Sequence, residues 1–82
     1  MSRYLVVDES PVILKVSARI LNGAGGETAG ALTLAEAETL LAEGPPFDLV
    51  ILSAAMPDAP VDKVLRDLRA RPGYAAVPMF VS

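Results

Sequence analysis

Two adjacent carboxylates, Asp8 and Glu9, follow a short apolar segment near the start of the chain. Paired carboxylates supply the oxygen ligands that hard divalent cations such as Mg²⁺ prefer. A purely structural reading stands beside this one, because acidic side chains also end strands and lie favourably at helix N-termini. The chain has no cysteine and no histidine. Disulfides, thiol chemistry, zinc fingers and Ser-His-Asp catalysis are therefore excluded.

Composition and charge narrow the class of protein further. With 82 residues the chain makes one domain at most. Hydrophobic residues are 52% and charged residues 21%, which is typical of a packed globule and not of a disordered chain. The net charge of -3 argues against a nucleic-acid surface, which needs a basic excess. No segment approaches the ~20 apolar residues of a membrane span, so we expect no membrane contact. The absence of cysteine fits a cytoplasmic protein, and we expect that location.

Four short segments are expected to form strands. Residues 3–7 and 48–52 are apolar, β-branched runs that end at polar residues, as strands buried on both faces do. Residues 77–81 form a last strand. Residues 27–31 contain a glycine, and we assign a strand there from context more than from propensity.

Three helices are expected between these strands. Ser10-Pro11 supplies an N-cap followed by proline at the first helical position. Gly23 is a natural left-handed stop for that helix. Thr33 and Glu36 fit a capping box, and Pro60 can open the third helix. Strands that alternate with helices imply an α/β domain with a parallel sheet.

Four segments together resemble the receiver domain of bacterial response regulators. Leu5 to Pro11 (Leu-Val-Val-Asp-Glu-Ser-Pro) resembles the family's first strand, which ends in paired acids. Ala31 with Glu36-Ala37 corresponds to the passage from the second strand into the second helix. Asp48 to Asp58 resembles the third strand with its phosphorylation loop, and Val77 to Val81 resembles the fourth strand.

The resemblance implies a CheY-like, flavodoxin-like fold. We therefore expect residues 1–82 to form a three-layer α/β domain with a parallel sheet in the order 2-1-3-4. The domain would be truncated after the fourth strand, because the fifth strand, its lysine and the last two helices of a receiver are absent from this sequence.

The same resemblance assigns roles to five residues. Asp8 and Glu9 match the acid pair that holds the metal ion, and Ala55 can offer its backbone carbonyl to the cation. Ser53 falls where the phosphate-accepting aspartate should be. Ser82 lies one position short of the usual switch hydroxyl, so its match is doubtful. A serine cannot form an acyl phosphate and removes one anionic ligand, so we expect no cofactor beyond weakly bound Mg²⁺.

The function implied is that of a degenerate receiver, which is not an enzyme. It would act in two-component signal transduction by binding a histidine kinase or another signalling protein. The alternative is a phosphorelay receiver in which a neighbouring acid, Asp58 or Asp8, accepts the phosphoryl group. A flavodoxin-like small-molecule binder that uses the same crevice ranks last, since the sequence has no phosphate-cradling loop.

The expected fourth strand would lie at the edge of the sheet. It is interior in a whole receiver, but here residues 77–81 would form an exposed, apolar sheet edge. Such an edge is a template for pairing with another chain. Three explanations stay open: a homodimer through this edge, a piece of a larger protein, or a small natural domain completed by a different partner.

Overall fold

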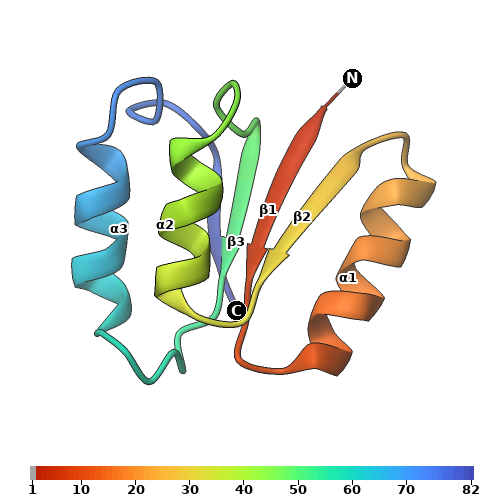
Figure 1. Ribbon diagram of the computed structural model, residues 1–82, viewed down its shortest axis with the longest axis horizontal. Coiled ribbons are helices and arrows are strands. Elements are labelled where there is room, and N and C mark those ends of the chain that lie inside the picture. Colours follow the sequence, from red (N-terminus) through yellow and green to blue (C-terminus); the bar gives the residue numbers. More distant parts are fainter. Residues whose placement is uncertain (1) are drawn as a thin grey trace.

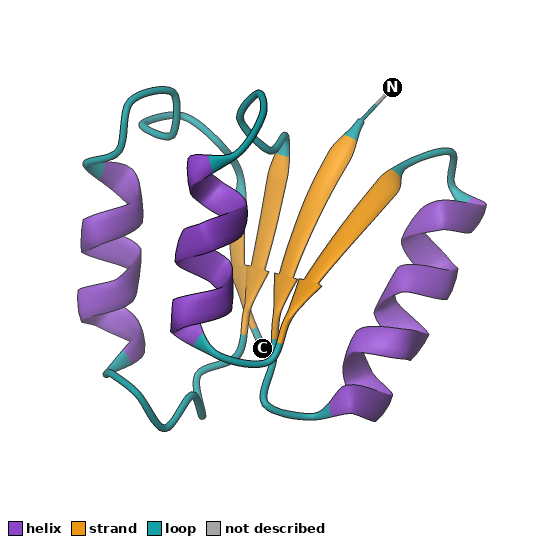
Figure 2. Cartoon of the chain, viewed as in Figure 1, coloured by secondary structure: helices purple, strands orange, loops and turns teal. Residues whose placement is uncertain are grey.

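The computed structural model describes residues 2–82. In Figure 1 a central sheet has α1 on one side and α2 and α3 on the other, and Figure 2 shows strands and helices alternating along the chain. Within the described residues, no helix has the length and apolar composition needed to cross a bilayer. The elements are β1 (Arg3–Val7), α1 (Pro11–Gly23), β2 (Glu27–Ala31), α2 (Leu34–Ala42), β3 (Leu49–Leu52), α3 (Val61–Arg69) and β4 (Met79–Val81).

The sheet is parallel, with strand order β2-β1-β3-β4. This confirms the predicted three-layer α/β architecture and the predicted order. In one row across the sheet, Val6 pairs with Gly30 on one side and Ile51 on the other, and Ile51 pairs with Phe80. Because all four strands run the same way, their carboxyl ends meet at one edge, where ligands bind in open α/β sheets.

The face of the sheet beneath α2 and α3 holds the main core. Leu5, Val7, Val50 and Leu52 alternate onto this face and are at most 2% exposed. Burying a side chain of this size contributes about 1.5–3 kcal/mol. The strands that carry these residues are therefore held firmly, and the loops at their ends start from fixed positions. The remaining buried members of the cluster are Ala31, Ala37, Phe47, Met56, Leu68 and Tyr74.

The opposite face is covered only in part. α1 packs over β2 and β1, where the side chain of Leu14 lies against Gly30, and Val6 is buried. Further along the same row Ile51 is half-buried, and Phe80 on β4 is 58% exposed. α1 itself leaves an apolar stripe in solvent, formed by Val12, Ile13, Val16 and Ile20.

The predicted end of the first helix was wrong by two residues. Gly23 is helical, and the left-handed residue is Gly25, with φ of 91°. The N–H of Gly26 donates to the Leu21 carbonyl and the N–H of Gly25 donates to the Asn22 carbonyl, at 3.2 and 3.0 Å. This is the Schellman pattern of helix ends, and it needs a glycine one residue past the cap. Pattern alone did not distinguish between three nearby glycines.

Candidate functional site

Asp8 and Ser53 lie side by side at the carboxyl edge of the sheet. Asp8 follows β1 and Ser53 follows β3, and the last residues of these strands, Val7 and Leu52, are paired. The Ser53 N–H donates to the Val7 carbonyl at 2.9 Å, which continues the ladder for one more step. Both side chains are buried, with exposures of 6% and 5%. The structure thus brings together two of the residues that the sequence singled out.

The Asp8 carboxylate is held by the loop that leads into α1. Its Oδ1 accepts a hydrogen bond from the Ser10 N–H at 2.9 Å, and its own N–H donates to the Ala31 carbonyl at 3.0 Å. Ser10 in turn caps α1, since its Oγ accepts from the Ile13 N–H at 3.4 Å. The carboxylate is therefore fixed between the ends of β1 and β2 and the start of α1.

The Ser53 hydroxyl takes part in the turn that follows β3. Its Oγ accepts a hydrogen bond from the Ala55 N–H at 3.1 Å. Short polar side chains often bond to the backbone two residues on and so stabilise a turn. The hydroxyl at this position can stabilise the loop and donate its own hydrogen to an acceptor, but it offers no carboxylate for attack on a phosphoryl group.

The remaining predicted site residues lie in the loops at the same edge. Ser82 follows β4, and its N–H donates to the Leu52 carbonyl while its carbonyl accepts from the Ala54 N–H, both at 3.0 Å. These two bonds dock Ser82 beside the Ser53 loop. Glu9 and Ala55 lie in the β1–α1 and β3–α3 loops, and both are exposed.

Asp58 makes a long-range contact with α2 that the sequence did not predict. Its Oδ2 accepts a hydrogen bond from the Leu34 N–H at 3.3 Å, so this carboxylate reaches across to the N-terminus of α2. Half of the predicted capping box is present nearby, since the Thr33 Oγ1 accepts from the Glu36 N–H at 3.1 Å, but the Glu36 carboxylate does not bond to the Thr33 N–H. The Glu36 carboxylate accepts from the Leu32 N–H, at 2.8 Å. Asp58 thereby ties the β3–α3 loop to α2.

The donor set at this edge suits a cation that keeps much of its water. Asp8 and Glu9 carry carboxylates in the β1–α1 loop, and Ala55 carries a backbone carbonyl in the β3–α3 loop. Mg²⁺ in proteins is usually held by one or two carboxylates and several waters. Between residues 2 and 82 no group of three acidic, histidine or cysteine side chains is clustered for metal binding. A Mg²⁺ site at Asp8, Glu9 and Ala55 therefore stays a prediction, and a serine at position 53 supplies one anionic ligand fewer than an aspartate would.

Comparison with known proteins agrees with the geometry. No family model and no curated protein sequence matches the chain. Solved structures do match it: the chemotaxis response regulator CheY4 of Vibrio cholerae superposes with a TM-score of 0.90 over 99% of this chain, at 26% sequence identity. The chain has the fold of a CheY-like response-regulator receiver domain.

Two further receiver structures are similar to this one. A response regulator receiver protein from Pseudomonas putida matches 98% of this chain with a TM-score of 0.85 and 26% identity. The signal receiver domain of a signal transduction histidine kinase from Syntrophus aciditrophicus matches 99%, with a TM-score of 0.85 and 26% identity. The chain spans 67%, 65% and 61% of the three matched structures, so the predicted truncation relative to a whole receiver is confirmed.

Proposed function

We propose that this receiver-fold chain is a non-phosphorylatable binding module of two-component signalling and not an enzyme. The observation that carries the proposal is the residue after β3. Ser53 is buried beside Asp8, at the position that the resemblance to receivers assigns to the phosphate-accepting aspartate, and its hydroxyl accepts the Ala55 N–H. Phosphoryl transfer to a receiver needs a nucleophile in line with the leaving group and a metal that offsets developing charge. Ser53 removes the first and weakens the second.

The partner we propose is a histidine kinase or another signalling protein in the cytoplasm. The apolar stripe of α1 supports this choice. The helix starts two residues after Glu9, so the stripe begins beside the crevice, and Val12 and Ile20 are 68% and 67% exposed. Apolar side chains gathered on one exposed face mark protein interfaces. A helical surface of a kinase, apolar along one side, fits a stripe of this kind.

A second copy of the chain is the other partner that the structure favours. β4 is an edge strand with Phe80 and Val81 exposed. The Val50 N–H donates to the Pro78 carbonyl and the Ser82 N–H donates to the Leu52 carbonyl, which turns the peptide groups between them alternately toward β3 and away from it. Met79 and Val81 therefore direct backbone groups outward, where an antiparallel copy of β4 can pair with them.

Incubation with a small phosphodonor and Mg²⁺, followed by a phosphate-affinity gel, tests the absence of phosphotransfer. An intact receiver domain serves as the positive control. We expect no shifted band for the wild-type protein, for Ser53→Ala or for Asp58→Asn. A shifted band that survives Ser53→Ala but disappears in Asp58→Asn or Asp8→Asn would overturn the proposal in favour of a phosphorelay through a neighbouring acid.

A further inference from the structure

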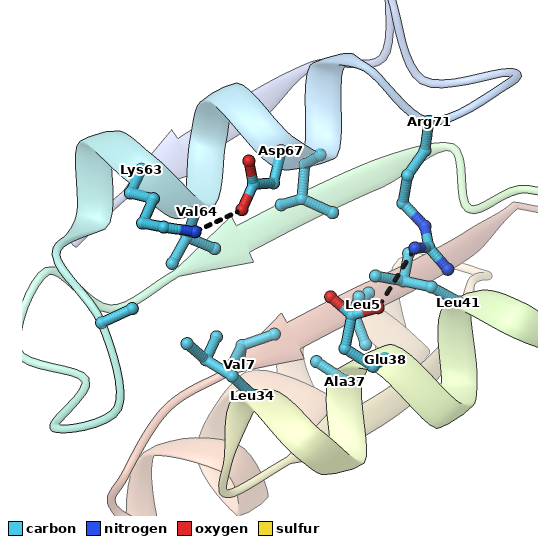
Figure 3. A pocket seen from close by; sticks show the side chains of 12 residues that line it. Leu5, Val7, Leu34, Ala37, Glu38, Leu41, Lys63, Val64, Asp67 and Arg71 are labelled. Carbon is cyan, nitrogen blue, oxygen red and sulfur yellow. Dashed lines mark hydrogen bonds and ion pairs between the residues drawn. The ribbon is translucent and has the colours of Figure 1, made fainter.

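A cleft of about 240 Å³ lies between α2 and α3 (Figure 3). Its floor is formed by Leu5 and Val7 of β1, together with Ala37 of α2 and Leu68 of α3. These four residues are at most 5% exposed, so little of the floor is open to solvent, and most of the accessible surface of the cleft belongs to its walls. The cleft is a property of the packing of the two helices on the sheet and does not involve Ser53.

The floor has no polar side chain to offer a ligand. The side chains that form it are hydrocarbon, and Leu34, Leu41 and Val64 continue the apolar surface up the walls. A water molecule needs two to four hydrogen-bond partners to occupy a cavity, and apolar cavities stay dry and take up apolar molecules such as benzene. The deep part of the cleft therefore favours a hydrocarbon surface over water.

The charges at the rim are already paired. Lys63 Nζ lies 3.0 Å from Asp67 Oδ2 on α3, and Arg71 Nη1 lies 3.1 Å from Glu38 Oε2 on α2 (Figure 3). A ligand that carries a net charge would have to compete with one of these pairs or approach a side chain of its own sign. A neutral ligand leaves both pairs intact. The two rim pairs therefore favour a ligand without net charge.

The size of the cleft limits the ligand further. An apolar cavity of about 150 Å³ holds benzene, whereas sites for drug-sized ligands measure about 300–1,000 Å³. At about 240 Å³ the cleft lies between these two classes. We propose that the α2–α3 cleft binds a small, neutral, apolar molecule of the size of one or two fused rings, a role that goes beyond the proposed partner binding.

The lining connects the cleft to the crevice. Val7 immediately precedes Asp8, and Ala59 follows Asp58, whose carboxylate accepts the Leu34 N–H. A ligand that contacts Leu34 and Ala59 touches both sides of this link. Binding in the cleft should therefore change the environment of the β1–α1 and β3–α3 loops. The amide NMR signals of residues in these loops should shift when the ligand binds.

Titration of the protein with indole, followed by ¹⁵N-amide NMR, tests the proposal. We expect saturable shifts at Leu34, Ala37 and Val64, with smaller shifts at Asp8 and Asp58. Two variants fill the cleft: Ala37→Leu from the floor and Ala59→Leu from the loop. Each should weaken indole binding at least about tenfold. Ala35→Leu is the matched control, because Ala35 is exposed on α2 and does not line the cleft.

Benzoate is the charged probe of similar size, and we expect it to bind at least about tenfold more weakly than indole. Shifts that do not saturate, shifts centred on α1 or β4, or equal binding by wild type and Ala59→Leu would overturn the proposal. If Ala37→Leu fails to fold, Ala59→Leu decides the question, since its side chain enters from a loop. Tighter binding of benzoate than of indole would overturn the proposed class of ligand.

Discussion

The phenol oxygen of Tyr74 accepts a hydrogen bond from the backbone N–H of Phe47, 2.9 Å away and buried. Tyr74 lies in the segment that leads into β4, and Phe47 lies in the segment that leads into β3. The Phe47 ring also lies beneath the Arg3 guanidinium, 4.5 Å from its centre. This contact joins the starts of neighbouring strands at the amino edge of the sheet, opposite the candidate site.

Tyr74→Phe should therefore destabilise the protein although it removes only one oxygen. The Phe47 N–H would lose its partner while still buried, which costs about 1–3 kcal/mol. In a domain of this size each kcal/mol corresponds to a fall of about 4–8 °C in Tm. Urea and thermal unfolding measure the effect, with Tyr4→Phe as the control because Tyr4 is only half-buried. Equal stability of the two variants would show that the Tyr74 bond is not a structural tie.

The exposed edge of β4 predicts self-association. Light scattering after size-exclusion chromatography should find a dimer of the wild-type protein at micromolar concentration. Val81→Lys should make it monomeric, because a lysine on an edge strand opposes pairing with a second strand. Val12→Lys is the matched control, since it places the same charge on an exposed apolar position of α1. A monodisperse wild-type monomer would rule out pairing through β4.

The features that follow from neighbouring residues were predictable from the sequence. The Ser10-Pro11 helix start depends on adjacent positions, and the meeting of Asp8 and Ser53 follows from parallel pairing of the strands that precede them. The contact of Asp58 with Leu34 joins residues 24 apart and depends on how α2 packs. Sequence periodicity contains no such information. The α2–α3 cleft could not be predicted from the sequence either, because its volume depends on the distance between two helices.

The stripe on α1 predicts where a kinase binds. Val16→Glu introduces a charge at the middle of the stripe, at a position that is 49% exposed, so folding should be little affected. Affinity for the dimerisation domain of a histidine kinase from the same organism should fall at least about tenfold, as at the centre of an interface. Calorimetry measures it, and Val81→Lys is the control, since it alters only the sheet edge. Unchanged affinity in Val16→Glu would place the interface elsewhere.

Weak Mg²⁺ binding at the carboxyl edge is the last prediction. Addition of millimolar Mg²⁺ should shift the amide signals of Asp8, Glu9 and residues 53–56, because Mg²⁺ in proteins is usually held by one or two carboxylates and waters, and we expect Asp8, Glu9 and the Ala55 carbonyl to act as its ligands. Asp8→Asn should abolish the shifts. The asparagine oxygen can still accept the Ser10 N–H, so the loop keeps the bond that now measures 2.9 Å, and only the charge is lost.

Asp62→Asn provides the control, because Asp62 is an exposed carboxylate in the first turn of α3. Shifts that persist in Asp8→Asn but disappear in Asp62→Asn would place the cation outside the crevice. Ser53→Asp should strengthen binding relative to wild type, since it restores a carboxylate beside Asp8 where the structure has a neutral hydroxyl. An unchanged Mg²⁺ affinity in Ser53→Asp would mean that the loss of the acceptor is not what weakens the metal site.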